Sequence, residues 1–115
     1  MKKYDLIVTG DLGRLGRDLL IELLGERGID VKEEKLFDCG KEIFDPRQDT
    51  HCGGSGCGCA ASMLCAHILP RIASGQLQRV LFLATGALLS PTSTMQGESI
   101  PGVAHAVVFE HAKEE

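Results

Sequence analysis

The 115-residue sequence lacks features that several large classes of protein require. It has no tryptophan and one tyrosine, Tyr4, and none of its apolar runs approaches the ~20 residues that a membrane-spanning helix needs. Its basic residues are scattered and its formal net charge is -4, which argues against a nucleic-acid-binding protein. Residues 1–5 lack the apolar core of a signal peptide, so we expect an intracellular protein.

The five cysteines favour free thiols over a disulfide framework or a metal site. An odd number of cysteines in a reducing compartment predicts thiols. Cys52, Cys57 and Cys59 lie near His51, but structural zinc sites usually use two separated and closely spaced pairs of ligands. Cys65 falls on another helical face. We therefore expect no metal and no cofactor, although a reactive thiolate at Cys57 or Cys59 stays open.

The length and the 43% hydrophobic content predict one compact domain over residues 1–115. Alternating strand and helix patterns predict an α/β fold. The expected elements are a strand over residues 4–9, a helix from residue 12 to about Gly28, a short strand over 36–39, a helix over 59–74, and strands over 79–85 and 104–110.

Both helices carry further local predictions. Asp11 should cap the first helix, and Gly28 should end it in a left-handed conformation. Pro70 should kink the second helix or shorten it to Leu69, and Gly75 should lie just beyond its end. Leucines at helical spacing predict one apolar face on the first helix, made of Leu12, Leu15, Leu19, Leu20, Leu23 and Leu24.

Residues 9–16 fit the pattern Thr-Gly-x-x-Gly-x-x-Gly, which is typical of the dinucleotide-binding turn of short-chain dehydrogenases. Asp38 partly supplies the acidic residue that would hold a ribose, but the segment before it is too polar for a central strand. With Tyr4 as the only tyrosine, no Tyr-x-x-x-Lys pair can exist. The other interpretation is that Gly13 and Gly16 allow close packing of the helix on the sheet. An NAD(P)-binding Rossmann-type fragment remains an alternative function.

A second glycine-rich segment precedes the second helix. Successive backbone N–H groups in such a loop suit a carboxylate or a phosphate. A tight turn with close backbone packing is the equally weighted alternative. The segment consists of Gly53, Gly54, Ser55, Gly56, Cys57 and Gly58.

Four segments together resemble the stage V sporulation protein AD family: residues 4–13, 53–59, 84–91 and 98–110. The resemblance implies a thiolase-like fold, of which this chain would be most of the second half. It implies a mixed β-sheet with packed helices and an antiparallel pair of last strands. The half that holds the thiolase nucleophile, and the strand and helix that open the second half, are expected to be missing.

The resemblance also implies a protein that is not an enzyme. Where condensing enzymes have a catalytic His this chain has Thr9 and Gly10, and where they have a catalytic Asn it has Gly56, Cys57 and Gly58. Without these groups no donor pair stabilises a thioester enolate or oxyanion.

The function implied is the binding of dipicolinic acid, with or without calcium, to support its uptake into the spore and its release at germination. The protein would lie peripherally at the spore inner membrane with other stage V sporulation proteins that span it. Binding residues implied by loop chemistry are Gly53, Gly54, Ser55, Gly56, Cys57 and Gly58, joined by Ser90, Thr92, Ser93, Glu98 and Ser99. A scaffold subunit is the third alternative, and a homodimer is possible because a lone half should expose apolar surface.

Overall fold

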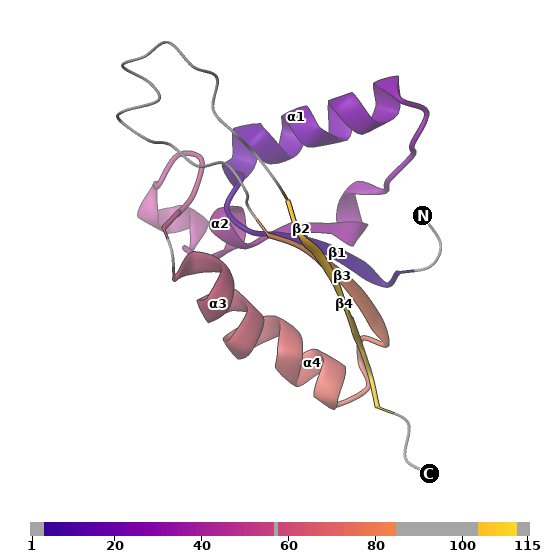
Figure 1. Ribbon diagram of the computed structural model, residues 1–115. Helices are drawn as coiled ribbons and strands as arrows, with labels where there is room; N and C mark the ends of the chain where they lie inside the picture. Colours follow the sequence, from indigo (N-terminus) through magenta and orange to yellow (C-terminus); the bar gives the residue numbers. More distant parts are fainter. Residues whose placement is uncertain (1–3, 57, 85–103, 113–115) are drawn as a thin grey trace, which may run out of the picture.

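The computed structural model describes residues 4–56, 58–84 and 104–112, and its centre is a four-stranded mixed sheet in the order β2-β1-β3-β4 (Figure 1). Both β2 and β3 run parallel to β1, whereas β4 is antiparallel to β3. The predicted α/β class and the antiparallel last pair are therefore confirmed. The strands are β1 (Leu6–Thr9), β2 (Leu36–Asp38), β3 (Arg79–Leu83) and β4 (Ala106–Glu110).

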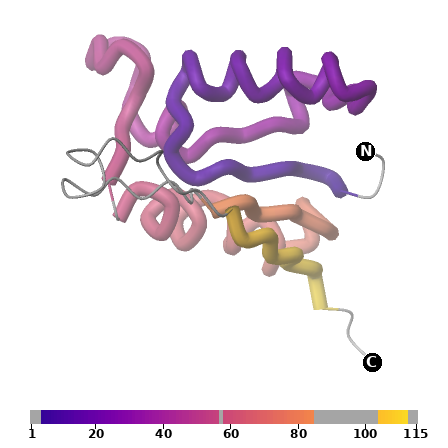
Figure 2. The backbone as a smooth tube through the Cα atoms, turned by 45° about the horizontal axis from the view of Figure 1, so that its top comes forward, coloured from indigo at the N-terminus to yellow at the C-terminus, as the bar shows by residue number. Residues whose placement is uncertain are grey.

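The two inner strands are apolar on both faces because helices cover the sheet from both sides (Figure 2). Along β1, Val8 is 0% exposed and belongs to one core cluster, while Ile7 is 4% exposed and belongs to the other. Val80 of β3 lies in the same cluster as Val8. Successive residues of a strand point to opposite faces, so the run Leu6–Ile7–Val8 supplies both layers of the core.

On one face lies α1 (Gly13–Glu26), which packs Leu20, Ile21 and Leu24 against the cluster of Ile7, Val31 and Leu36. The predicted single apolar face is wrong in part, because the helix turns only these residues toward the sheet. The other four predicted members of that face are exposed: Leu12, Leu15, Leu19 and Leu23.

The end of α1 is formed by Gly28, whose φ is 77°, as predicted. Its N–H donates to the Gly25 carbonyl at 3.1 Å, and the N–H of Ile29 donates to the Leu24 carbonyl at 2.8 Å. These two bonds form a Schellman motif, which requires a left-handed residue that glycine adopts at little cost.

The opposite face of the sheet is covered by a helical run in three parts: α3 (Cys59–Met63), the π-helical η3 (Leu64–Ile68) and α4 (Leu69–Ala73). Pro70 neither ends this run nor shortens it to Leu69, which corrects one of the two predicted effects. Proline has no N–H to donate to the preceding turn, and here it lies in the first turn of α4, directly after the wider π turn. Gly75, with φ of 84°, follows the end of the run.

Short helical segments lie between α1 and α3 in sequence. These are η1 (Glu33–Lys35), α2 (Cys39–Glu42) and η2 (Pro46–Gln48). Asp45 caps η2 through a capping box with Gln48. Asp49 and His51 then adopt left-handed φ values of 53° and 57°, which return the chain toward α2. Within the described ranges, none of the helices is long and apolar enough to cross a bilayer.

Candidate functional site

The glycine-rich loop crosses the start of α2 at very short range. The N–H of Gly54 donates to the Gly40 carbonyl at 2.6 Å, and the N–H of Gly40 donates to the Gly10 carbonyl at 3.0 Å. A Cβ atom on Gly53, where φ is 118°, would collide with the backbone of Gly40. Glycine is therefore required at this crossing, as the sequence interpretation of close backbone packing allowed.

Asp38, at the end of β2, holds the surrounding segments together. Its side chain is 0% exposed, and its two oxygens accept hydrogen bonds from the Thr9 hydroxyl and from three backbone N–H groups. The distances are 2.7 Å to Thr9 Oγ1, 2.9 Å to Leu12 N, 2.8 Å to Gly13 N and 2.9 Å to Lys41 N. One carboxylate thus caps the starts of α1 and α2 together.

The predicted cap from Asp11 is wrong. The residue before α1 is Leu12, which makes no side-chain cap, and Asp38 reaches the N-terminus of α1 from a strand that follows in sequence. Asp11 instead accepts a hydrogen bond from Gly56 N at 3.3 Å. Asp11 therefore ties the glycine-rich loop to the end of β1.

This arrangement fills the place where a dinucleotide phosphate would lie. The N–H of Arg14 donates to the Cys52 carbonyl at 2.7 Å, and the N–H of Gly13 is bound to Asp38. A Cβ atom on Gly13 would lie 3.0 Å from that same Cys52 oxygen. The close approach at Gly13 is thus to the loop at Cys52 rather than to the sheet, and the buried Asp38 has no access to a ribose.

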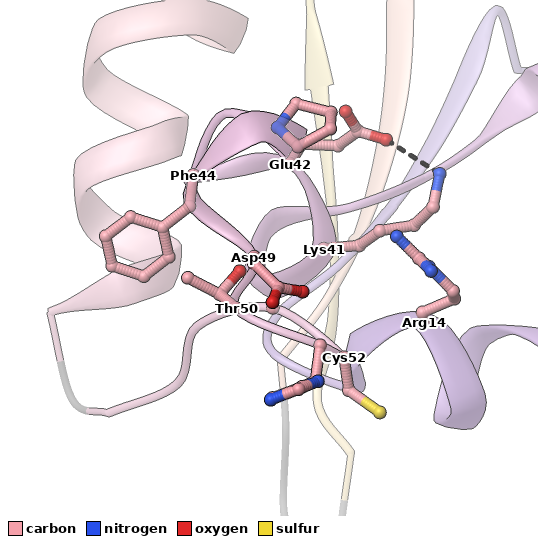
Figure 3. A pocket seen from close by; sticks show the side chains of 10 residues that line it. Arg14, Lys41, Glu42, Phe44, Asp49, Thr50 and Cys52 are labelled. Atoms are coloured by element: carbon pink, nitrogen blue, oxygen red, sulfur yellow. Dashed lines mark hydrogen bonds and ion pairs between the residues drawn. The ribbon is translucent and has the colours of Figure 1, made fainter.

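A pocket of about 220 Å³ opens beside this crossing (Figure 3). Arg14 of α1 and Lys41 of α2 both line the pocket and point to the same side in the view of Figure 3, and the Phe44 ring lies on the other side of that view. Asp49 and Thr50 lie between them in the view of Figure 3. The full lining is Arg14, Lys41, Glu42, Phe44, Pro46, Asp49, Thr50, His51, Cys52 and Gly53.

The charges of the pocket are partly paired. Lys41 Nζ lies 3.1 Å from Glu42 Oε1, with the two side chains 31% and 41% exposed. Such an exposed pair contributes little on its own and leaves two donor positions on the ammonium group. The exposed Arg14 guanidinium makes no ion pair with a described residue. The pocket lining therefore contains two cationic groups, together with the carboxylates of Glu42 and Asp49.

The thiols near the pocket differ in burial. Burial raises the pKa of Cys39 to about 12, with smaller contributions from Cys59 and Asp38, and burial also raises the pKa of Cys59. Neither buried thiol is thereby an activated nucleophile, because the thiolate is the reactive form. Cys52 is exposed at the pocket wall. Across residues 4–56, 58–84 and 104–112, no three His, Cys, Asp or Glu side chains gather as a metal site.

The residues predicted for ligand binding are only partly brought together. Gly53 lines the pocket, and the N–H groups of Gly53, Gly54 and Gly56 all donate within the chain. Ser55 and Gly58 are exposed beyond the crossing. The other predicted residues lie outside the described residues: Cys57, Ser90, Thr92, Ser93, Glu98 and Ser99.

Nine of the ten lining residues were not predicted to bind a ligand, among them Arg14, Lys41 and Phe44. Arg14 occupies a variable position of the Thr-Gly-x-x-Gly-x-x-Gly pattern, and Lys41 and Phe44 belong to no motif, so no local pattern marks these three as ligand-binding residues. A useful clue would have been the position of Arg14 and Lys41 after the two strand ends, since the carboxyl ends of parallel strands meet at one edge.

Comparison with known proteins identifies the family of this chain. A family model described as stage V sporulation protein AD matches residues 1–110. Stage V sporulation protein AD of Bacillus subtilis (strain 168) is 49% identical over 109 residues, which are 95% of this chain and 32% of the relative. The chain thus spans about a third of that relative's length. On these matches, the chain belongs to the stage V sporulation protein AD family.

Proposed function

We propose that this chain is a non-catalytic sporulation protein that binds dipicolinic acid and supports its uptake into the spore and its release. Membership of the family supports the role in sporulation. The observation that carries the ligand proposal is the pocket that Arg14, Lys41 and Phe44 line together.

The chemistry of this pocket suits an aromatic dicarboxylate. Arg14 can bind one carboxylate with two parallel N–H groups, and Lys41 can bind the second as a compact charge. Phe44 is 41% exposed, so its ring is accessible for stacking on a flat aromatic ligand. Dipicolinate carries two carboxylates on one pyridine ring, which matches this set of groups.

Calcium enters the proposal as part of the ligand. Glu42 and Asp49 line the pocket, and carboxylate oxygens are ligands that calcium prefers. Two carboxylates are too few for a protein calcium site, and the described residues hold no cluster of three. We therefore propose that calcium, when present, is held mainly by dipicolinate, with Glu42 and Asp49 completing its coordination.

The absence of catalysis is supported by what occupies the position of the expected histidine. Thr9, at the position where condensing enzymes have the histidine, is buried, and its hydroxyl donates a hydrogen bond to Asp38 at 2.7 Å. Gly10 uses its carbonyl to hold Gly40 at 3.0 Å. Both residues thus serve the packing of the strand ends. Peripheral association with the spore inner membrane, through partners that span it, is the remaining part of the proposal and rests on the family.

Titration calorimetry of the chain with dipicolinate, with and without calcium, tests the proposal. We expect saturable binding that weakens about tenfold in Arg14→Gln and in Lys41→Gln, since each removes a charge that faces a carboxylate. Arg47→Gln is the matched control: Arg47 is exposed and pairs with Asp45 at 2.9 Å, outside the pocket lining. It should bind like the unchanged chain.

Two outcomes would contradict the proposal. Absence of saturable binding to dipicolinate, with or without calcium, would favour the scaffold alternative. Equal affinity in Arg14→Gln, Lys41→Gln and Arg47→Gln would place the ligand elsewhere. NADH serves as a parallel ligand, and we expect no binding because Cys52 and Asp38 fill the start of α1.

A further inference from the structure

A row of leucines faces outward on α1, on the far side from the sheet. Leu12 is 37% exposed, Leu15 62%, Leu19 49% and Leu23 56%. Their spacing of three, four and four residues places them in one line along the helix, which we call the leucine stripe. Figure 2 shows α1 as the outermost helix on its side of the sheet.

The leucine stripe is distinct from the packing face of α1. Leu20, Ile21 and Leu24 already bury against the sheet, so the helix does not need the stripe to hold its place. A surface helix of a monomer normally carries polar residues opposite its packed face. A continuous apolar row on that side is typical of a surface that meets another molecule.

One flank of the stripe is acidic. Asp18, Glu22 and Glu26 are all exposed and follow one another at four-residue spacing, which sets them in a row beside the leucines. Asp18 lies 3.7 Å from Arg17 Nη1, whereas Glu22 and Glu26 have no ion-pair partner in the described residues. The opposite flank carries a charge only at its end, on Arg27.

The acidic row beside the leucine stripe distinguishes three kinds of molecule that could bind there. An anionic lipid surface is disfavoured because it would meet the acidic row. A second copy packed antiparallel would bring the two acidic rows together, since equivalent flanks meet in an antiparallel helix pair. A helix with apolar residues on one face and lysine or arginine beside them would pair with both the stripe and the row.

We propose that the leucine stripe of α1 docks an amphipathic helix of a partner protein, with basic residues on the flank that meets Asp18, Glu22 and Glu26. The 14 residues of α1 give a contact about 21 Å long, which suits a partner helix of about four turns. The surface is separate from the pocket proposed for dipicolinate, because helical spacing sets Arg14, which lines that pocket, on another side of α1 from the leucine stripe.

Two synthetic helical peptides of about four turns test this proposal. Both carry a leucine face, and the flanking residues are lysine in one peptide and glutamate in the other. By fluorescence anisotropy on the complete chain, we expect the lysine peptide to bind at least about tenfold more tightly than the glutamate peptide. The double variant Leu15→Ser/Leu19→Ser should lose at least about tenfold of that affinity. Ile29→Ser, which changes an apolar side chain that is 39% exposed just beyond α1, is the matched control.

A charge reversal distinguishes electrostatic recognition from nonspecific hydrophobic binding. In Glu22→Lys/Glu26→Lys the preference should invert, so that the glutamate peptide becomes the tighter ligand. All variants change exposed side chains, and circular dichroism checks that each is folded. Equal affinity for the two peptides, or unchanged binding in Leu15→Ser/Leu19→Ser, would overturn the proposal.

Two further results would also overturn it, each in favour of another occupant. A dimer in sedimentation velocity that dissociates in Leu15→Ser/Leu19→Ser would assign the stripe to a second copy of the chain. Binding to vesicles containing anionic lipid, lost in the same double variant, would assign it to a membrane surface.

Discussion

Asp38 illustrates how one residue can organise a region built from distant segments. A buried carboxylate is costly unless its oxygens are fully hydrogen-bonded. Here four donors from β1, α1 and α2 surround it. Because these donors include the starts of two helices, the carboxylate also lies where a negative charge is favoured.

We expect Asp38→Asn to lower the free energy of unfolding by about 2–4 kcal/mol. In asparagine an NH2 group replaces one of the two oxygens, so its N–H donors would face two groups that now donate hydrogen bonds to Asp38. Urea unfolding of the chain measures this change. In the control Asp18→Asn, on a carboxylate that is 61% exposed, the change should stay within about 0.5 kcal/mol. Equal effects for the two variants would contradict the capping role of Asp38.

Cys39 links stability to pH at the same place. Burial, helped by Cys59 and Asp38, raises its pKa from 9.0 to about 12, so the folded chain keeps a proton that the unfolded chain loses. This stabilising contribution is complete below pH 9 and is lost as the pH rises toward 12. The free energy of unfolding should therefore fall by up to about 1.4 kcal/mol per pH unit in that window.

Urea unfolding of the chain and of Cys39→Ala at several pH values isolates this contribution. The variant should be less stable at pH 8 because it leaves space in the core, but its decline above pH 9 should be shallower. Parallel declines in the two proteins would show that Cys39 titrates in the folded state as it does in the unfolded chain.

At the scale of elements, α1 offers two glycines in contrasting settings. Gly28 lies beyond the helix with φ of 77°, a conformation that side chains with a Cβ atom rarely adopt. Gly25 lies within α1, and a Cβ atom there would meet nothing within 4 Å. The backbone therefore requires glycine at Gly28, whereas at Gly25 glycine only lowers the stability of the helix.

We expect Gly28→Ala to destabilise the chain by about 1 kcal/mol and Gly25→Ala to stabilise it by about 0.5–1 kcal/mol. The first change opposes the left-handed end of the helix, whereas the second removes backbone freedom from the unfolded chain. Thermal or urea unfolding gives both values. The same sign for both substitutions would contradict the Schellman motif at the end of α1.

Local sequence predicted these elements well where short-range chemistry determines them. The β-branched run ending at Thr9 gave β1, and Gly28 marked the end of α1, because both signals lie within a few residues. The capping of α1 by Asp38 could not be predicted in this way, since its partners are 25 and 26 residues apart in sequence. Helical spacing also cannot tell a packed leucine from an exposed one, which is why the predicted apolar face combined the packed Leu20 with the exposed Leu15 and Leu19.

At the scale of the whole molecule, the pocket is assembled from three segments that no single pattern unites. Arg14 comes from α1, Lys41 from α2, and Gly53 from the loop that crosses Gly40. Of the two interpretations left open for the glycine-rich loop, the structure shows the close backbone approach, at Gly53 and Gly54. Its neighbours Arg14 and Lys41 could not be predicted from local sequence, because they follow the ends of β1 and β2, which lie side by side only in the folded parallel sheet.

The most direct test of dipicolinate binding in this pocket is amide chemical-shift mapping of the 12.4 kDa chain during titration with dipicolinate. The account predicts saturable shifts that are largest at Arg14, Lys41, Phe44 and the segment 50–53, where the ligand would contact the pocket wall. The amides of α4 and β4, on the other side of the molecule, should change little. Shifts centred on those elements, or no saturable shift at any residue, would contradict the account.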